Sequence, residues 1–401
     1  MTPKVIVQTP EPRASAALYV FEFVKALHES AVPVALFCPE NFEYAGQLHT
    51  AGIALLPAPA RPVSPASLVA RLWRNAVWVA KTAAMQFKIT QPGDLVHFQF
   101  LIHLPLGFIF LLLVRSKRAG IVFTAHDPLP HKWRLPASLR WLEKGMLAWA
   151  YRLCDAIIVH NQIGKGILID EFQYPAERIA IVPHGPLAAA PESAAYPEAD
   201  VLRLLLFGSI RENKGVHLAI EAIQNLGGKV RLTIAGSVTA AHREYWKHCQ
   251  ELIRRDAQSI DVLERYFEDD ELPPLLARHH AVLMPYLDFF SESGVASLAL
   301  SSERPIISTA AGGLAELLEQ SGGGILIEAP SAEGIQTAIE NASALGFAAL
   351  KQKGVDGSAY LQAARSWKTI GEKTRQVYVT LHGPAIGTAK RFEIPFPGNH
   401  G

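Results

Sequence analysis

Residues 284–316, MPYLDFFSESGVASLALSSERPIISTAAGGLAE, decide the fold of this 401-residue chain. They follow a short apolar run, residues 281–284, which Pro285 ends as it would end a buried parallel strand. A polar and aromatic loop then leads to a helix of small residues that opens at Gly294. The pattern predicts a strand, a loop and a helix in close succession.

A second strand and a second helix follow directly. Residues 306–308 form a short apolar run, and Gly312 and Gly313 turn the chain into a helix that begins near Leu314. Two helix N-termini would then lie at the carboxyl ends of two neighbouring parallel strands, where open α/β sheets bind ligands and where phosphate is favoured. The alternative is an ordinary βαβ unit that binds no ligand.

The same alternation runs through both halves of the chain and predicts parallel sheets covered by helices. In the first half, strands are predicted at residues 5–7, 32–37, 53–56, 94–97, 120–124, 155–159 and 179–182. In the second half, they are predicted at residues 202–207, 229–235, 260–262, 265–267, 281–284, 306–308 and 324–327.

An Ala- and Pro-rich stretch, residues 186–200, separates the two halves and has the low periodicity of an interdomain linker. It divides the chain into a first domain, residues 1–185, and a second domain, residues 201–357. Helical periodicity predicts a C-terminal helix within residues 358–385, and residues 386–401 are predicted to form a frayed tail.

Charge is distributed unevenly along the chain, although the net charge is only +1. Residues 1–185 hold 18 Lys and Arg against 12 Asp and Glu, which gives +6, and the rest holds 20 against 25, which gives −5. The small net charge argues against a nucleic-acid binder. The basic first half suggests contact with something anionic, unless the asymmetry arises by chance.

The three cysteines, Cys38, Cys154 and Cys249, lie far apart, without metal-ligand spacing and without the number for a complete disulfide framework. A reducing, cytoplasmic compartment is therefore expected. The N-terminus enters a strand-like segment without a signal-peptide pattern. The most apolar run, residues 98–114, is too short and too interrupted by polar residues and proline to span a membrane.

Residues 68–89, LVARLWRNAVWVAKTAAMQFKI, predict a helix that contains four cations, two tryptophans and no acidic residue. Two interpretations stay open. The aromatic face could pack on the sheet, or the helix could lie on an anionic membrane surface, which would make the protein peripheral to the inner face of the membrane.

Residues 207–215, FGSIRENKG, follow a predicted strand and open a predicted helix. Gly208 allows the backbone to approach a ligand closely. Arg211 and Lys214 lie three residues apart, so both cations can reach one anion. A diphosphate suits them, because Arg binds it bidentately and Lys adds a point charge. Two solvated surface cations are the alternative.

The motifs of this chain, taken in order, resemble those of the family 4 glycosyltransferases. In the second half the resemblance rests on FGSIRENKG, on the acidic turn FEDDEL at residues 267–272, on PYLDFFSESGV and on RPIISTAAGGLAEL. In the first half it rests on FTAHDPLPH at residues 123–131 and IVPHG at residues 181–185. The resemblance covers nearly the whole chain and is strongest over residues 203–327.

The resemblance implies an α/β fold of two Rossmann-like domains with parallel sheets facing across a cleft, the GT-B fold. The second domain would hold a nucleotide-diphospho-sugar and the first domain an acceptor, with the C-terminal helix crossing back to the first domain. Arg211 and Lys214 would neutralise the diphosphate, and His126 would reach over the sugar. The donor-binding residues would be Gly208, Ser209, Phe267, Glu292, Ser293, Gly294 and Val295.

The chain departs from the family at two positions. The family often carries two glutamates eight residues apart before the small-residue helix, and the matching positions here are Phe290 and Leu298. Glu292 is nearby, at the place where a subset with FGxIRxxKG carries Gln before Ser-Gly. The resemblance is therefore to that subset, with Glu292 as a candidate contact to the donor.

The expected activity is a metal-independent glycosyl transfer to a glycan or lipid-linked acceptor of the cell envelope or of a polysaccharide. No cofactor besides the nucleotide-sugar co-substrate and no metal site is expected. The resemblance implies retention of configuration, whereas an inverting reaction would need a side-chain base, for which His126 and Asp127 are candidates. A non-catalytic nucleotide-sugar-binding subunit and a sugar-nucleotide epimerase are the alternatives.

Overall fold

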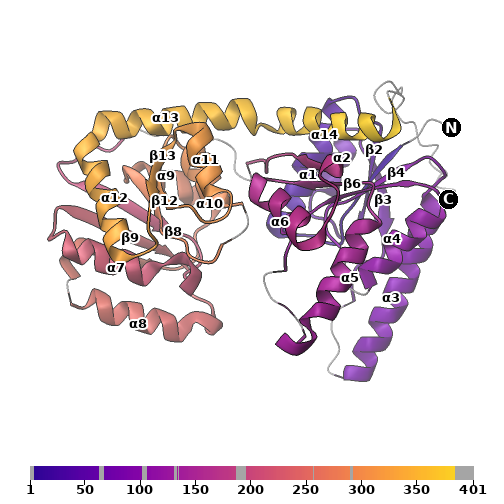
Figure 1. The fold of residues 1–401 in the computed structure, drawn as a ribbon, viewed down its shortest axis with the longest axis horizontal. Helices are drawn as coiled ribbons and strands as arrows, with labels where there is room; N and C mark the ends of the chain where they lie inside the picture. The colour runs from indigo at the N-terminus through magenta and orange to yellow at the C-terminus, as the bar shows by residue number, and fades with distance from the viewer. Residues whose placement is uncertain are drawn as a thin grey trace, which may run out of the picture. The chain divides into compact units, whose positions relative to one another are not determined.

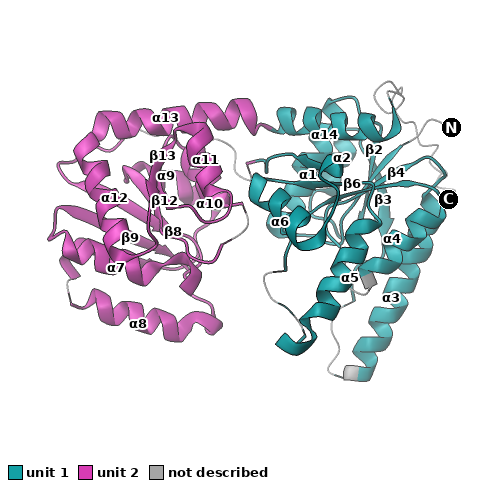
Figure 2. Cartoon of the chain, viewed as in Figure 1, with its two compact units in different colours: residues 1–185, 367–401 teal, residues 186–366 magenta. Residues whose placement is uncertain are grey.

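A computed structural model of the chain describes residues 4–62, 67–101, 106–130, 133, 135–186, 196–255, 257–289 and 292–383. It contains two compact units (Figure 2). The first comprises residues 1–185 and 367–401, and the second comprises residues 186–366. Most of the predicted linker, Phe290 and the predicted tail lie outside the described residues.

The first unit contains a seven-stranded sheet in which all neighbouring strands run parallel. The strands, in spatial order, are β3 (Ala54–Ala58), β2 (Val34–Pro39), β1 (Val5–Gln8), β4 (Leu95–Phe98), β5 (Gly120–Thr124), β6 (Ala156–Val159) and β7 (Ile179–Ile181). The helices are α1 (Ala14–Glu29), α2 (Ala45–Thr50), α3 (Leu68–Ile89), α4 (Leu106–Ser116), α5 (Arg140–Arg152), α6 (Gln162–Phe172) and α14 (Trp367–His382). In Figure 1, α1, α2 and α14 cover one face of the sheet, and α3, α4 and α5 cover the other.

The second unit contains a six-stranded parallel sheet. Its strands, in spatial order, are β10 (Ile260–Glu264), β9 (Val230–Gly236), β8 (Leu202–Phe207), β11 (Ala281–Met284), β12 (Ile306–Thr309) and β13 (Gly324–Ile327). The helices are α7 (Val216–Asn225), α8 (Arg243–Ile253), α9 (Leu272–Ala277), α10 (Gly294–Ser301), α11 (Leu314–Ser321), α12 (Ala332–Leu345) and α13 (Phe347–Ala364).

The two sheets confirm the predicted α/β class with two Rossmann-like domains. In each sheet the strand order reverses beside the first strand, between β1 and β4 in the first unit and between β8 and β11 in the second. Such a reversal opens a crevice at the carboxyl ends of the strands, where α/β sheets bind ligands. The strands β8 and β11 therefore mark the place in the second unit where a ligand is expected.

Two predicted elements differ from the structure. Residues 265–267 do not form a strand, because the chain turns after β10, where the Arg265 amide donates to the Leu263 carbonyl, and Phe267 enters the core. The C-terminal helical region comprises two helices, since α13 begins at Phe347 and ends before Arg365. Arg365 adopts a non-helical conformation with φ −120° and ψ 11°, and its guanidinium is engaged elsewhere in the second unit.

The helix α3 packs one part of its aromatic side chains into the first unit, as the first interpretation expects, and leaves another part exposed. Trp78 is buried, and its indole nitrogen donates a hydrogen bond of 2.8 Å to the Pro59 carbonyl. Trp73, about one and a half turns earlier, is 70% exposed. Among the described residues, no helix is both long enough and apolar enough to cross a membrane.

The last helix, α14, completes the first unit although it follows the whole of the second. The Tyr378 hydroxyl lies 2.5 Å from Nδ1 of His97, which is buried on β4. Gly371 packs directly on α1, where a Cβ atom would lie 2.5 Å from the Ala26 carbonyl oxygen. Close backbone contact between α1 and α14 therefore depends on glycine.

We expect Gly371→Ala to destabilise the first unit by roughly 2 kcal/mol, because the new methyl group meets a backbone oxygen that cannot move aside without displacing α1. Thermal or urea unfolding would measure this. Gly145→Ala is the matched control, since Gly145 is exposed on α5 with no atom within 4 Å of its Cβ position. That change should stabilise the helix by up to about 1 kcal/mol. Equal stabilities of the two variants would contradict the close packing of α14 on α1.

Candidate active site

The loop after β8 presents the two candidate phosphate-binding cations at the crevice of the second sheet. The strand ends at Phe207, and Gly208 adopts a φ of +116°, which L-residues with a side chain rarely take. Ser209 follows and is partly exposed. Arg211 then caps a short 3-10 turn that ends with Lys214, before α7 begins. The tight turn brings both cations to the carboxyl end of β8.

Lys214 is a desolvated cation held over aromatic rings. Its Nζ atom lies 3.4 Å from the centroid of the Tyr286 ring and 5.0 Å from that of Phe289. Burial, with a smaller contribution from the charge of nearby Arg211, lowers the pKa of Lys214 to about 7. A half-buried lysine beside a second cation is poorly stabilised without a counter-ion. An anion bound here would stabilise both charges.

The N-terminus of α10 lies beside these cations. Ser293 caps the helix, and its side chain accepts a hydrogen bond from the Ala296 amide. The amides of Gly294 and Val295 belong to the first turn, which has no acceptor within a helix. The loop after β11 is joined to the Lys214 turn, since the Leu287 amide donates to the Asn213 carbonyl at 2.9 Å. The structure thus brings helix amides and cations to one crevice, as an oxyanion site requires.

The second helix N-terminus of the opening stretch lies one strand further away. Helix α11 follows β12, which is separated from β8 by β11. Both predicted helix starts exist and follow neighbouring parallel strands. The reversal of strand order at β8 and β11 favours α10, rather than α11, as the helix that would meet phosphate.

Glu292 is held by a buried ion pair. Its carboxylate lies 2.7 Å from the Arg365 guanidinium, and the two side chains are only 9% and 3% exposed. Burial by itself would lower the pKa of Arg365, but Glu292 and Tyr360 outweigh burial and raise it. The pair fixes the loop before α10 to the end of α13, so Glu292 has a structural partner in addition to its predicted place at the donor.

We expect Glu292→Gln to destabilise the second unit by about 3 kcal/mol, because it leaves the Arg365 charge buried without its counter-ion. The double change Glu292→Gln and Arg365→Met removes both charges and should recover most of that loss in thermal unfolding. If the double variant is stable but no longer binds a nucleotide-sugar, Glu292 also serves the donor. Full donor binding in the double variant would assign Glu292 a purely structural part.

Two further predicted positions lie in the core of the second unit. Phe267 is 7% exposed, its ring meets Phe207 edge-on with centroids 6.0 Å apart, and the Arg265 guanidinium lies 3.9 Å from its centroid. Leu298, at the second position where the family has glutamate, packs against the same apolar cluster. The Phe267 ring therefore packs in the core against Phe207, where β8 ends at the crevice loop.

In the first unit, His126 lies at the centre of an aromatic group at the ends of β5, β6 and β7. Its ring stacks on Phe100 with centroids 4.6 Å apart and meets Tyr19 edge-on at 4.8 Å. Nδ1 of His126 lies 2.9 Å from Nε2 of His160. Burial, followed by the neighbouring histidines, lowers the pKa of His126 well below 6.5.

The contacts of His160 determine which nitrogen of His126 is open. Nδ1 of His160 lies 2.8 Å from the Val182 carbonyl and must donate to it, so Nε2 of the neutral ring is an acceptor. His126 then donates from Nδ1 and keeps its lone pair on Nε2. Among the described residues, Nε2 of His126 has no hydrogen-bond partner. Nε2 of His126 is therefore a buried acceptor whose tautomer is set by the contact with His160.

From the sequence, no role in the site was assigned to the residues that surround His126, although the IVPHG motif contains His184. His184 stands at the end of β7 with Nδ1 2.7 Å from the Gly185 carbonyl, and Tyr19 on α1 packs against both His184 and Trp367. His160 and His184 both follow predicted strands, so their places at strand ends were a usable signal. Tyr19 and Trp367 gave none, because they come from helices distant in sequence.

Asp127 follows His126 on a loop that is fixed from below. The Tyr151 hydroxyl donates to the Pro128 carbonyl at 2.7 Å, and Asp127 itself is partly exposed. Among the residues that the structure describes, no three His, Cys, Asp or Glu side chains are grouped as metal ligands. The two candidate sites are thus built from cations, helix amides and a cluster of histidines.

Comparison with known proteins finds a glycosyltransferase family model in each half of the chain. Residues 16–185 match the family model described as Glycosyltransferase Family 4, and residues 202–344 match the one described as Glycosyl transferases group 1. Glycogen synthase of Mycobacterium tuberculosis (strain ATCC 25618 / H37Rv) is 26% identical over 238 residues, which are 58% of this chain and 56% of the relative. The chain thus aligns with about half the length of this curated relative.

Solved structures share the fold over nearly the whole chain. Anabaena Alr3699/HepE in complex with UDP and glucose has a TM-score of 0.69 at 16% identity and covers 94% of this chain and 100% of its own. Sucrose-phosphate synthase from Thermosynechococcus elongatus has a TM-score of 0.71 at 17% identity, with 94% and 99% covered. The chain therefore contains a Glycosyltransferase Family 4 domain and a Glycosyl transferases group 1 domain, which together cover most of the sequence, and it has the GT-B fold.

Proposed function

We propose that the protein transfers a sugar from a nucleotide-diphospho-sugar to a glycan or lipid-linked acceptor of the cell envelope or of a polysaccharide. The observation that carries this is the crevice at β8 and β11, where Arg211 and the desolvated Lys214 lie beside the N-terminus of α10. The similar Anabaena protein has been solved in complexes with UDP and with UDP-glucose, which supports a donor of this class.

In the proposed reaction, the bond between the sugar C1 atom and the diphosphate oxygen breaks, and negative charge develops on the phosphate. Arg211 would bind the phosphate bidentately, Lys214 would become fully protonated, and the α10 amides would add their dipoles. These groups can stabilise the leaving group without a metal ion. Gly208 and Ser209 would let the phosphate approach the backbone.

The His126 geometry favours retention of configuration. Its pKa lies well below 6.5, so at neutral pH His126 is a weak base, but its fixed lone pair can accept a hydrogen bond from a sugar hydroxyl. The acceptor proton would then pass to the departing phosphate as the acceptor oxygen bonds to C1. Asp127 is the candidate base for an inverting reaction. NMR of the product shows whether the configuration at C1 is retained or inverted. The same measurement on Asp127→Asn shows whether Asp127 is needed as a base.

The test of the proposed function is release of nucleoside diphosphate that depends on both donor and acceptor. A thermal-shift screen over nucleotide-sugars first selects the donor, because a ligand of the folded state raises its melting temperature. Donor binding without turnover across a broad acceptor panel would instead indicate a non-catalytic subunit, as Leu298 in place of the family's glutamate suggests. Conversion of the donor without any acceptor would indicate an epimerase.

The reaction would take place in the cytoplasm. Cys38, Cys154 and Cys249 are free and buried, which suits a reducing compartment.

A further inference from the structure

The first unit exposes large apolar side chains on three neighbouring helices. Trp73 on α3 is 70% exposed, and Trp141 and Trp149 on α5 are 67% and 61% exposed. Helix α4 lies between them, since it packs against α3, and its Phe108 ring lies 6.2 Å from that of Trp149. We call this set the apolar face; its other exposed members are Val69, Leu72, Ile109, Leu112, Leu139 and Leu142.

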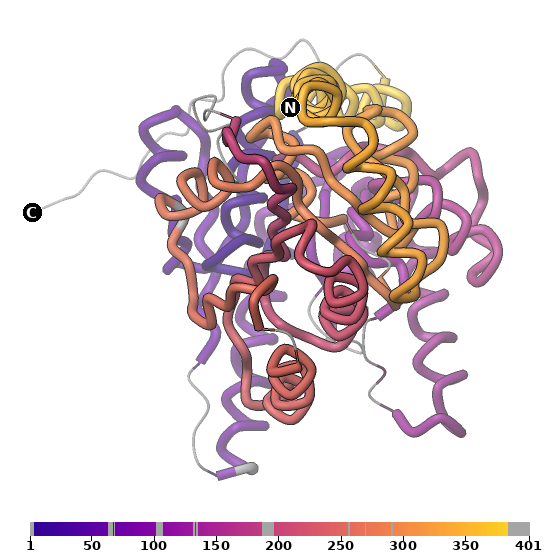
Figure 3. Tube along the Cα trace, turned by 90° about the vertical axis from the view of Figure 1, so that its left-hand side faces the viewer, coloured from indigo at the N-terminus to yellow at the C-terminus, as the bar shows by residue number. Residues whose placement is uncertain are grey.

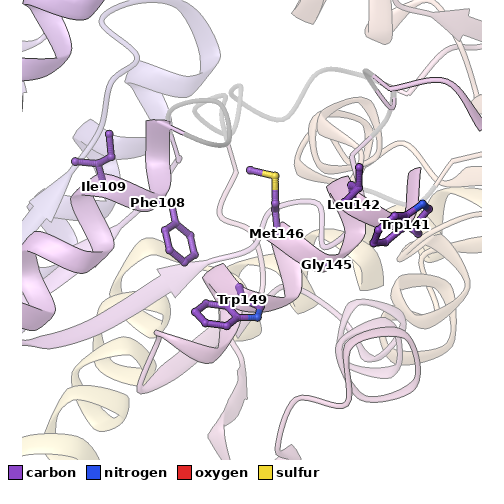
Figure 4. Close-up of a pocket in the computed structure, with 7 residues that line it drawn as sticks. All are labelled: Phe108, Ile109, Trp141, Leu142, Gly145, Met146 and Trp149. Carbon is purple, nitrogen blue, oxygen red and sulfur yellow. The ribbon is translucent and has the colours of Figure 1, made fainter. Parts of the chain in front are cut away.

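The apolar face is hollowed between α4 and α5. A groove of about 620 Å³ is lined almost wholly by apolar groups, from Phe108, Ile109, Trp141, Leu142, Gly145, Met146 and Trp149. Figure 4 shows the Phe108 ring on α4 and the Met146 and Trp149 side chains on α5 lining one end, with Trp141 and Leu142 further along α5. An apolar space of this volume suits hydrocarbon chains.

The N-terminal ends of α3 and α5 extend past the sheet in the same direction, as both Figure 1 and Figure 3 show. These ends carry Leu72 and Trp73 on α3, and Trp141 and Leu142 on α5. Because both helix ends extend past the sheet, their exposed tryptophans can insert into the same flat surface.

The charge of the same region is strongly positive. Between Glu43 and Glu143 the sequence contains eleven Lys and Arg but only two acidic residues, Asp94 and Asp127. On α3 the exposed cations Arg71, Arg74, Lys81 and Lys88 alternate with the apolar residues, and α3 has no acidic residue at all. A surface with this mixture is complementary to an anionic and apolar partner.

We propose that the apolar face of α3, α4 and α5 docks on the surface of an anionic phospholipid bilayer. Trp73 and Trp141 enter the headgroup boundary, the groove between α4 and α5 takes acyl chains, and Arg71 and Arg74 bind lipid phosphates. Tryptophan beside arginine is the pairing found at the membrane interface, because the ring lies at headgroup depth while the guanidinium meets phosphate.

This surface is separate from the residues proposed for transfer. His126, Arg211 and Lys214 lie on none of the three helices. Membrane binding would bring the protein to a lipid-linked acceptor. Only this consequence rests on the proposed function; the docking itself does not. Vesicle binding and diphosphate release can therefore fail independently of each other.

Sedimentation of the full chain with vesicles tests the docking. Vesicles of phosphatidylcholine with about one third phosphatidylglycerol should bind the protein at low salt, with binding that weakens as salt screens the cations, whereas pure phosphatidylcholine should bind it poorly. Arg71→Gln with Arg74→Gln should lower the affinity roughly 10- to 30-fold. Trp73→Ser with Trp141→Ser should lower it about tenfold and remove the blue shift of tryptophan fluorescence on binding.

Matched controls come from the second unit. Arg254→Gln with Arg255→Gln changes two exposed cations, and Tyr266→Ser changes an exposed aromatic residue, so neither should alter vesicle binding. Two results would overturn the proposal. One is no binding to anionic vesicles at low salt. The other is a dimer of the free protein that Trp73→Ser with Trp141→Ser dissociates, which would show that a second copy covers the face.

Discussion

Lys214→Met is expected to stabilise the ligand-free protein and, at the same time, to remove most of its turnover. Methionine keeps the apolar stem over Tyr286 and Phe289 but removes a cation whose burial lowers the pKa to about 7. The gain should be about 2 kcal/mol at pH 6, or roughly 5 °C in melting temperature. Loss of the cation at the leaving group should lower turnover by about 100-fold or more.

The sign of the stability effect depends on pH. The pKa of Lys214 is lower in the folded protein than the ordinary lysine value of 10.5, so its charged form costs stability. The cost is complete below pH 7 and fades as the pH rises toward 10.5, where both states are neutral. The stability difference between Lys214→Met and the unchanged protein should therefore shrink between pH 7 and pH 10. The exposed Lys229→Met is the control and should show neither effect.

Donor binding should take up a proton at the same lysine. A diphosphate beside Lys214 raises its pKa, so above pH 7 the donor binds only with a proton, and its affinity should fall by up to about tenfold per pH unit. Calorimetry in two buffers of different ionisation enthalpy measures this uptake at pH 8. Proton uptake that persists in Lys214→Met would show that another group is responsible and would contradict the assignment.

His126→Ala is expected to lower turnover by about 100-fold while leaving donor binding nearly unchanged. The groups proposed to bind phosphate all lie in the second unit, whereas His126 would contribute only the lone pair on Nε2. The donor-induced thermal shift and the rate of diphosphate release separate the two effects. His49→Ala, an exposed change in the same unit, is the control. Equal losses of binding and turnover would assign His126 to folding instead.

His160 is expected to act through His126 as a positioning residue. His160→Phe removes the acceptor for Nδ1 of His126. The His126 imidazole is then free to rotate or to change tautomer, so Nε2 is no longer held as the acceptor. The turnover number should fall by roughly tenfold while the Michaelis constant for the donor stays within about twofold. A change confined to the Michaelis constant would contradict a positioning role.

The sequence predicted those features that depend on local pattern. Buried strands end at turn residues, so the crevice loop with Arg211 and Lys214 could be placed at the end of β8 from residues 207–215 alone. The same reasoning placed His126 at the end of β5. It also predicts that His160, at the end of β6, lies beside His126, because β5 and β6 are neighbours in the sheet. Strand ends that meet at one edge of a parallel sheet can be read from order and spacing.

Contacts between distant segments could not be predicted in this way. Glu292 and Arg365 are 73 residues apart, and His97 and Tyr378 are 281 apart. No periodicity signals such pairs, since each depends on how a whole helix packs. The apolar face shows the same limit. The pattern of α3 predicted an amphipathic helix, but only the packed structure shows that Trp78 is buried, with its indole bound to the Pro59 carbonyl, while Trp73 is exposed.

The position of α14 at the end of the sequence determines the order in which the two units can finish folding during synthesis. The first unit needs residues 367–382 to fill the space beside His97 and Ala26, and the ribosome makes them only after the whole second unit. The second unit is complete in sequence earlier and can fold first. During this interval the nascent first unit would leave the face of α1 that binds α14 uncovered. A stalled chain ending at residue 366 should therefore engage chaperones through its first unit.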